Sequence, residues 1–125
     1  MAAYIHPNAH DAALNYIKNG VENLYICSAE PTTFTEASST YKLGTKAAPT
    51  ITGPANGDVS GRKITISAIT DGSVSANGTA AWVALTDDSG SLLLAAQALN
   101  ATQVVSSGNE FTLTAFDIEY PDPTT

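Results

Sequence analysis

The N-terminal part of the chain carries one helical pattern. Apolar side chains recur at helical spacing at Ala9, Ala12, Ala13, Tyr16 and Ile17. These positions fall on one stripe of a helix over residues 8–19, and such a short helix needs to dock on another part of the chain to be stable. His6 precedes Pro7, and the residue before a proline is pushed toward extended geometry, so His6 is expected to lie outside the helix.

The next two segments differ in character. Residues 21–27 alternate between two faces, which predicts a strand. Residues 28–61 hold a concentration of turn-forming residues, namely Pro31, Pro49, Pro54, Gly44, Gly53, Gly57 and Gly61. We interpret residues 28–61 as a loop-rich arm that contains one helical turn beginning near Thr35 and Glu36.

Residues 62–120 have the pattern of a β core. The pair Asp71-Gly72 is a strong turn signal. Residues 79–86 are apolar on both faces, which predicts a central strand covered on two sides. The polar run at 87–90 then predicts a tight turn into a second such strand, residues 91–99, so that the two form a core hairpin.

Two segments of this core share a slip in their alternation. Residues 64–69 read Ile-Thr-Ile-Ser-Ala-Ile, and residues 111–116 read Phe-Thr-Leu-Thr-Ala-Phe. In each, the apolar positions change parity at the alanine, Ala68 or Ala115. A β-bulge produces such a slip, and so does a strand that passes from one sheet to another.

Together these patterns predict the fold class. One domain over residues 1–125 fits the length of the chain. We expect a mainly β protein, an antiparallel β-sandwich or jelly-roll-like domain with one short N-terminal α-helix.

Composition and charge narrow the class of partner. Only 14% of the residues are charged, and 12 acidic residues against 5 basic ones give a formal charge of −7. Such a charge repels phosphate backbones and anionic lipid, so we expect no nucleic-acid partner. No apolar run approaches the roughly 18 residues that span a bilayer, so no membrane contact is expected.

The search for reactive groups gives no catalytic constellation. Cys27 has no base or electropositive neighbour in sequence and is expected to be a buried structural thiol. His6 and His10 are four residues apart, but they are better explained as surface histidines near a helix start than as metal ligands. Asp87 and Asp88 fit a turn better than a calcium loop. We therefore expect no enzyme activity, no cofactor and no metal.

The basic residues are unevenly placed. Four of the five fall between positions 42 and 63: Lys42, Lys46, Arg62 and Lys63. One hypothesis is that they meet an acidic partner surface. The other is that they belong to a solvated loop and balance local acids. Both hypotheses remain open at this stage.

Several stretches resemble small structural proteins of tailed bacteriophages. They include Tyr4-Ile-His-Pro7, Asp11-Ala-Ala-Leu-Asn-Tyr-Ile-Lys18, Ile26-Cys-Ser28, Glu30-Pro-Thr-Thr33, Asp58-Val-Ser-Gly-Arg-Lys63, Ala68-Ile-Thr-Asp-Gly-Ser73, Ser107-Gly-Asn109 and Phe111-Thr-Leu-Thr-Ala115. The resemblance covers most of the chain. It implies a virion or head-region protein and carries over no catalytic residue.

Together with the small size, the predicted β structure and the acidic charge of the chain, this resemblance leads us to expect a capsid decoration, or cement, protein on the outer surface of the phage head. Its partners would be the major capsid protein and further copies of itself, as a homo-oligomer for which decoration proteins at local threefold positions suggest a trimer. The alternative is a tail, fibre or collar module that binds a host surface receptor such as a glycan, for which exposed aromatic platforms would be required. A small cell-wall hydrolase is a third possibility without sequence support.

Overall fold

The computed structural model describes residues 5–58 and 61–120. The helical elements are α1 (Pro7–Gly20) and a short π-helical turn, η1 (Glu36–Thr40). The strands in chain order are β1 (Asn23–Cys27), β2 (Lys42–Ala47), β3 (Ile51–Asn56), β4 (Arg62–Ile66), β5 (Ile69–Val74), β6 (Gly78–Asp87), β7 (Leu92–Val105), β8 (Glu110–Leu113) and β9 (Phe116–Tyr120). None of the helices in the described part of the chain has the length and apolar character needed to span a bilayer.

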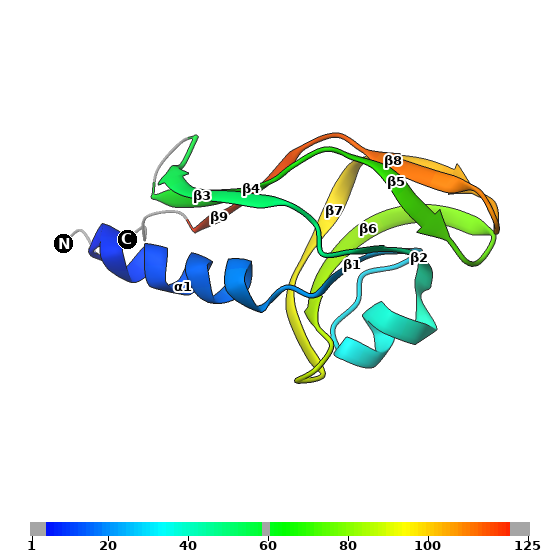
Figure 1. The fold of residues 1–125 in the computed structure, drawn as a ribbon, viewed down its shortest axis with the longest axis horizontal. Helices are drawn as coiled ribbons and strands as arrows, with labels where there is room; N and C mark the ends of the chain where they lie inside the picture. The colour runs from blue at the N-terminus through cyan, green and yellow to red at the C-terminus, as the bar shows by residue number, and fades with distance from the viewer. Residues whose placement is uncertain (1–4, 59–60, 121–125) are drawn as a thin grey trace.

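The strands form two antiparallel sheets, and the fold is mainly β and sandwich-like, as the sequence predicts (Figure 1). The larger sheet has six strands in the order β7-β6-β1-β2-β5-β8, and the smaller has three in the order β3-β4-β9. Strand β6 lies between β7 and β1, so the predicted position of residues 79–86 inside a sheet is confirmed. The predicted hairpin is also confirmed, because β6 pairs antiparallel with β7 across the turn.

One continuous ribbon of two strands belongs to both sheets. Strand β4 lies in the smaller sheet and β5 in the larger one, while β8 lies in the larger sheet and β9 in the smaller one. The two pass between the sheets side by side, with Ile66 opposite Phe116 and Ile69 opposite Leu113. The slips at Ala68 and Ala115 therefore mark strands that change sheets, which selects one of the two open explanations.

The larger sheet is covered on both faces. Side chains of β1 and β6 that face the smaller sheet join the main core, which includes Leu24, Ile26, Ile66, Val83, Leu85 and Phe111. On the opposite face Tyr25, Cys27, Ala37 and Ala84 form a smaller cluster beneath η1. Burial on two faces explains why residues 79–86, which lie in β6, are apolar on both faces. Cys27 is fully buried, as expected.

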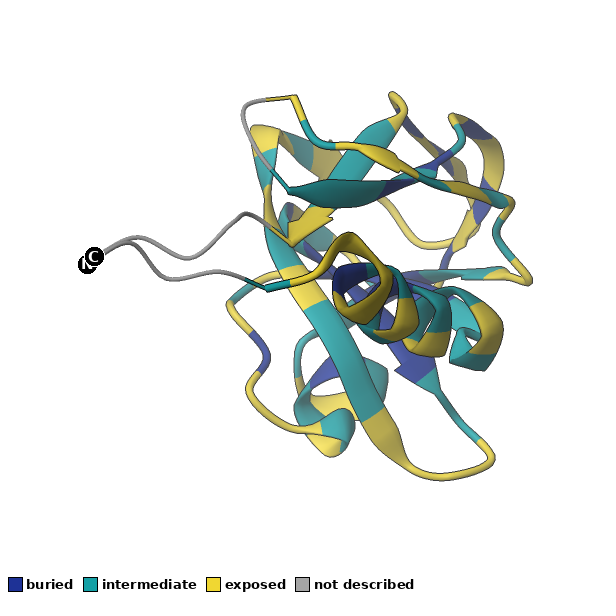
Figure 2. Ribbon diagram, turned by 90° about the vertical axis from the view of Figure 1, so that its left-hand side faces the viewer, coloured by how far each residue is buried: buried dark blue, intermediate teal, exposed yellow. Residues whose placement is uncertain are grey.

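Helix α1 packs with Leu14 and His10 inward, each about 1% exposed, and its outer side toward solvent (Figure 2). His6 has extended backbone geometry and its Nδ1 accepts a hydrogen bond from the Asn8 backbone N–H, so its predicted place outside the helix is confirmed. The expectation that His10 is a surface residue is wrong. Its ring stacks on Tyr120 of β9, with 4.6 Å between ring centroids, which covers the imidazole.

The interpretation of residues 28–61 as a loop-rich arm is wrong. The helical turn does begin at Glu36, but β2 and β3 also lie in this stretch, and β2 is an interior strand of the larger sheet between β1 and β5. Gly44 looks like a turn-forming residue in the sequence, but in the structure it allows two strands to pack closely. A β-carbon there would lie 2.6 Å from the Ser73 carbonyl oxygen. Glycine in a strand often marks such a close approach.

The predicted turn at Asp71-Gly72 is also wrong, because Gly72, like Gly44, is a glycine within a strand that allows close packing. Both residues lie within β5, where the pairing with β8 shifts register between Ile69 and Gly72. Gly72 stands directly opposite Phe111, and the aromatic ring lies across Gly72 and Gly44 on two successive strands. The glycines make room for this ring, and the dipeptide marks a bulge in a strand.

Candidate binding cleft

The four basic residues predicted as an interface are not brought together. In β2, Lys42 stands opposite Cys27 and Lys46 opposite Leu24, and the register shift between these pairs sends the two lysines to opposite faces of the larger sheet. Lys42 lies 5.6 Å from the centre of the Tyr25 ring. Lys46 forms an ion pair of 3.0 Å with Asp71 on β5.

The other two basic residues lie on β4 of the smaller sheet. Arg62 donates to both carboxylate oxygens of Asp11, at 2.7 and 3.3 Å, and so ties α1 to this sheet. Lys63 donates to Asp58 at 2.7 Å and to Asp117 at 3.0 Å. Contact of any of these residues with an acidic partner stays a prediction, but the four do not form one patch.

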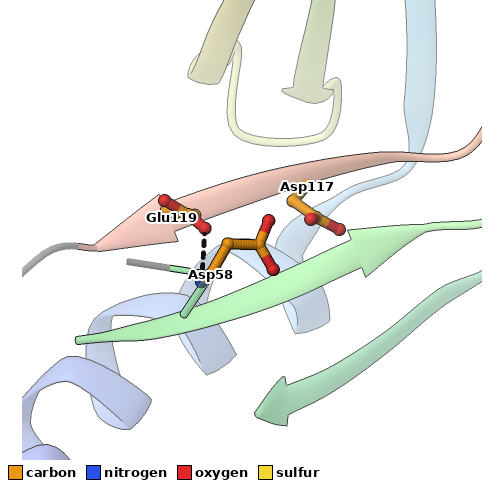
Figure 3. Close-up of side chains that lie close together, drawn as sticks. All are labelled: Asp58, Asp117 and Glu119. Atoms are coloured by element: carbon orange, nitrogen blue, oxygen red, sulfur yellow. Dashed lines mark hydrogen bonds between the residues drawn. The ribbon is translucent and has the colours of Figure 1, made fainter. Parts of the chain in front are cut away.

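A cluster of three acids surrounds Lys63. Carboxylate oxygens of Asp58, Asp117 and Glu119 lie within 4.8 Å of one another (Figure 3). Hydrogen bonds from Thr65 and Lys63 lower the pKa of Asp117, and those from Lys63 to Asp58 and Asp117 raise the pKa of Lys63. The ammonium group therefore supplies the positive charge that a metal ion would otherwise bring, and the cluster works as an ion-pair network between β4 and β9.

A cleft opens beside this cluster. Ala80 of β6 pairs with Gln103 of β7, but Trp82, only two residues further on, pairs with Ala98. Several residues of β7 between these two pairs therefore have no partner in β6 and bulge out of the pairing. The bulge faces the point where β8 gives way to β9. The resulting cavity has a volume of about 220 Å³ and is lined by Val83, Gln97, Ala98, Leu99, Asn100, Ala101, Gln103, Thr112, Leu113, Thr114 and Phe116.

The lining of this cleft is uncharged and combines polar with apolar side chains. Amide groups of Gln97, Asn100 and Gln103 and hydroxyl groups of two threonines surround an apolar floor that includes Phe116. Gln103 also donates from Nε2 to the Thr112 carbonyl oxygen at 2.7 Å, which joins the two edges of the larger sheet across the cavity. Such a lining suits a small neutral ligand with hydroxyl groups, or a protein side chain.

Sequence reasoning missed this cleft, although a signal existed. The largely apolar run of residues 91–99 ends at Asn100, and the next residues are small or polar. That break coincides with the bulge in β7. It could have been recognised as a strand irregularity, but only the tertiary structure brings it against Thr112–Phe116.

A second polar network lies at the turn between β6 and β7. Asp88 accepts hydrogen bonds from the Tyr25 hydroxyl at 2.6 Å and from the Thr86 hydroxyl. Burial opposes the ionisation of Asp88, but these hydrogen bonds and the nearby Lys42 charge outweigh it and lower its pKa. Burial together with Asp88 raises the pKa of Tyr25 to about 12. The network attaches this turn to β1, which agrees with the prediction that residues 87–90 form a tight turn.

Comparisons with known proteins add no relative. No family model matches this chain, and neither the curated proteins nor the solved structures contain a match. The class of the protein is therefore defined by its own fold, a mainly β, sandwich-like domain with an N-terminal helix.

Proposed function

We propose that this protein is a capsid decoration, or cement, protein of a tailed bacteriophage. It would bind the outside of the assembled head and reinforce contacts between major capsid subunits. The sequence resemblance to phage structural proteins motivates the proposal, and the arrangement of charge in the fold supports it.

The carrying observation is that every lysine and arginine side chain contacts a partner within the chain. Three of the five form ion pairs, Lys42 lies over Tyr25, and Lys18 donates to the Gly53 carbonyl oxygen at 2.8 Å. Lys18 and Lys42 keep their positive charges, but with 12 acidic residues against 5 basic ones the surface as a whole is acidic. Such a surface disfavours the packaged genome and leaves uncharged side chains for protein contacts, which suits a protein that acts by binding in many copies.

The stretches that carry the resemblance also include two of these ion pairs. Asp11 and Arg62 join α1 to β4, and Asp58 and Lys63 belong to the cluster beside β9. In this chain the shared polar residues hold the fold together. The resemblance is therefore best explained as one of fold, which is the level at which a family of contact-forming proteins needs to agree.

The test is the number of copies in purified virions. Quantitative mass spectrometry relative to the major capsid protein, together with a reconstruction of the particle, should give on the order of hundreds of copies spread over the head. Addition of the purified protein to heads that lack it should raise the temperature at which they release DNA. Absence from the virion, or a few copies at the tail, would overturn the proposal.

The cleft favours a second candidate, a tail, fibre or collar module that binds a neutral host glycan. Its volume of about 220 Å³, its amide and hydroxyl groups and the Phe116 side chain fit one sugar ring. Chemical-shift changes on titration with neutral monosaccharides should then map to the cleft and disappear in Asn100→Ala. The matched control is Asn109→Ala, which changes an amide in an exposed turn. Shifts unaffected by either variant would exclude this candidate.

A further inference from the structure

The two sheets expose four edge strands, and three of them carry features that discourage pairing with another chain. Strand β8 has only four residues and begins with Glu110. Strand β9 contains Asp117 and Glu119. Strand β3 contains Pro54 and an irregular register with its neighbour. Short length, charge and proline are the usual protections of a sheet edge.

Strand β7 lacks the short length, the charge and the proline, although its pairing with β6 shifts register at two places. It is fourteen residues long and contains no proline, glycine or charged residue. The uncharged stretch extends on both sides of the strand, from Ser89 to Asn109. Only Val105 is buried, whereas Leu92 is 42% exposed and Val104 is 85% exposed. A long, apolar, uncharged edge is a site at which another strand can add.

The free part of this edge is its N-terminal half. At the other half, Gln103 bridges to β8, and the bulge beside the cleft interrupts regular pairing. Residues 92–98 pair with β6 on one side, with one register shift at Leu94, and among the residues that the structure describes no strand lies on their other side. In Figure 1 this half of β7 runs past the C-terminal end of α1 to the turn that follows β6.

We propose that residues 92–98 of β7 pair antiparallel with the same residues of a second copy and form a two-fold symmetric dimer. Identical antiparallel strands satisfy such symmetry without any further partner. The net charge of −7 opposes contact between two copies wherever acids meet, and β7 lies in the longest uncharged run of the chain, residues 89–109, so self-association is least opposed at this edge. Ala95, Ala96 and Ala98 also allow close approach across the new strand pair.

The test is the oligomeric state of the full chain, measured by sedimentation equilibrium over a range of concentrations. The wild type should dimerise, and Ala96→Lys should raise the dimer dissociation constant at least tenfold, because Ala96 is exposed on the edge. The matched control is Thr70→Lys, an equally charged change at an exposed residue of the interior strand β5, which should leave the dimer intact. A wild-type monomer at every concentration, or an assembly that Ala96→Lys leaves unchanged, would overturn the proposal.

Disulfide trapping guards against a variant that fails to fold. Ala96→Cys or Ala98→Cys should give a covalent dimer on mild oxidation, while Thr70→Cys should not. The native thiol does not interfere, because Cys27 is fully buried. Cross-linking at neither β7 position would count against the dimer. This proposal does not depend on capsid binding, and either one can fail while the other stands.

Discussion

The packing of Phe111 over two glycines makes a quantitative prediction for Gly72→Ala. A β-carbon built on Gly72 would lie 2.3 Å from two ring carbons of Phe111. Carbon atoms in contact are about 3.5–4.0 Å apart, so the ring would have to retreat by roughly 1 Å or more. Phe111 is only 2% exposed and has little room to move.

Two known costs bound the loss in the free energy of unfolding that we expect for Gly72→Ala. Overpacking of a closed core costs about 1–3 kcal/mol, and complete loss of a buried phenylalanine costs about 3–5 kcal/mol. We expect Gly72→Ala to lower the free energy of unfolding by about 3 kcal/mol. The control is Gly90→Ala in an exposed turn, where the nearest atom is a flexible Asp87 carboxylate oxygen at 3.2 Å, and the change should stay below about 1 kcal/mol.

Urea unfolding followed by the fluorescence of Trp82, the one tryptophan, measures these values. If the clash causes the loss, Gly72→Ala should cost little more once Phe111→Ala has removed the ring. The double variant should then be nearly as stable as Phe111→Ala alone. Additive losses, or a loss below about 1 kcal/mol for Gly72→Ala, would refute the packing argument.

Three further predictions concern ionisable groups. Asp11→Asn should lower the free energy of unfolding by about 1 kcal/mol, because it breaks the contact of both carboxylate oxygens with Arg62. Asp71→Asn removes a more exposed ion pair and should cost less than about 0.5 kcal/mol. Chemical unfolding at low and high salt measures both values. The pKa of Asp117 is lowered in the folded state, so its contribution to stability is present at neutral pH and is lost as pH falls through about 4 and below. Asp117→Asn should flatten the acid limb of a stability-versus-pH curve, and an unchanged slope would contradict this. Burial raises the pKa of Cys27 to about 11, so a thiol reagent at pH 8 should modify it only when urea unfolds the protein.

The sequence predicts most of the fold because its strongest signals are local. The apolar stripe predicts α1 to within one or two residues at each end, and the two apolar runs at 79–86 and 91–99, joined by a polar turn, predict the core hairpin. The changes of parity at Ala68 and Ala115 can be seen in the local sequence, and they mark where two strands pass from one sheet to the other. These features follow from burial on one or two faces, which the sequence pattern displays directly.

The errors arise where a residue serves a neighbour distant in sequence. Gly44 and Gly72 look like loop and turn residues, but they accept the ring of Phe111 from another strand. His10 looks polar and exposed until Tyr120 covers it. The cleft and the pairing of Lys63 with Asp58 and Asp117 likewise depend on which strands become neighbours. No local pattern carries that information.

The ribbon that belongs to both sheets has a consequence for cooperativity. Because β4 continues into β5 and β8 into β9, separating either sheet from the core pulls on the backbone of the other. The two sheets should therefore behave as a single foldon, with amide protons of Ile64 and Ile69 exchanging through the same global opening. A domain built in this way resists stepwise fraying and loses its structure only all at once.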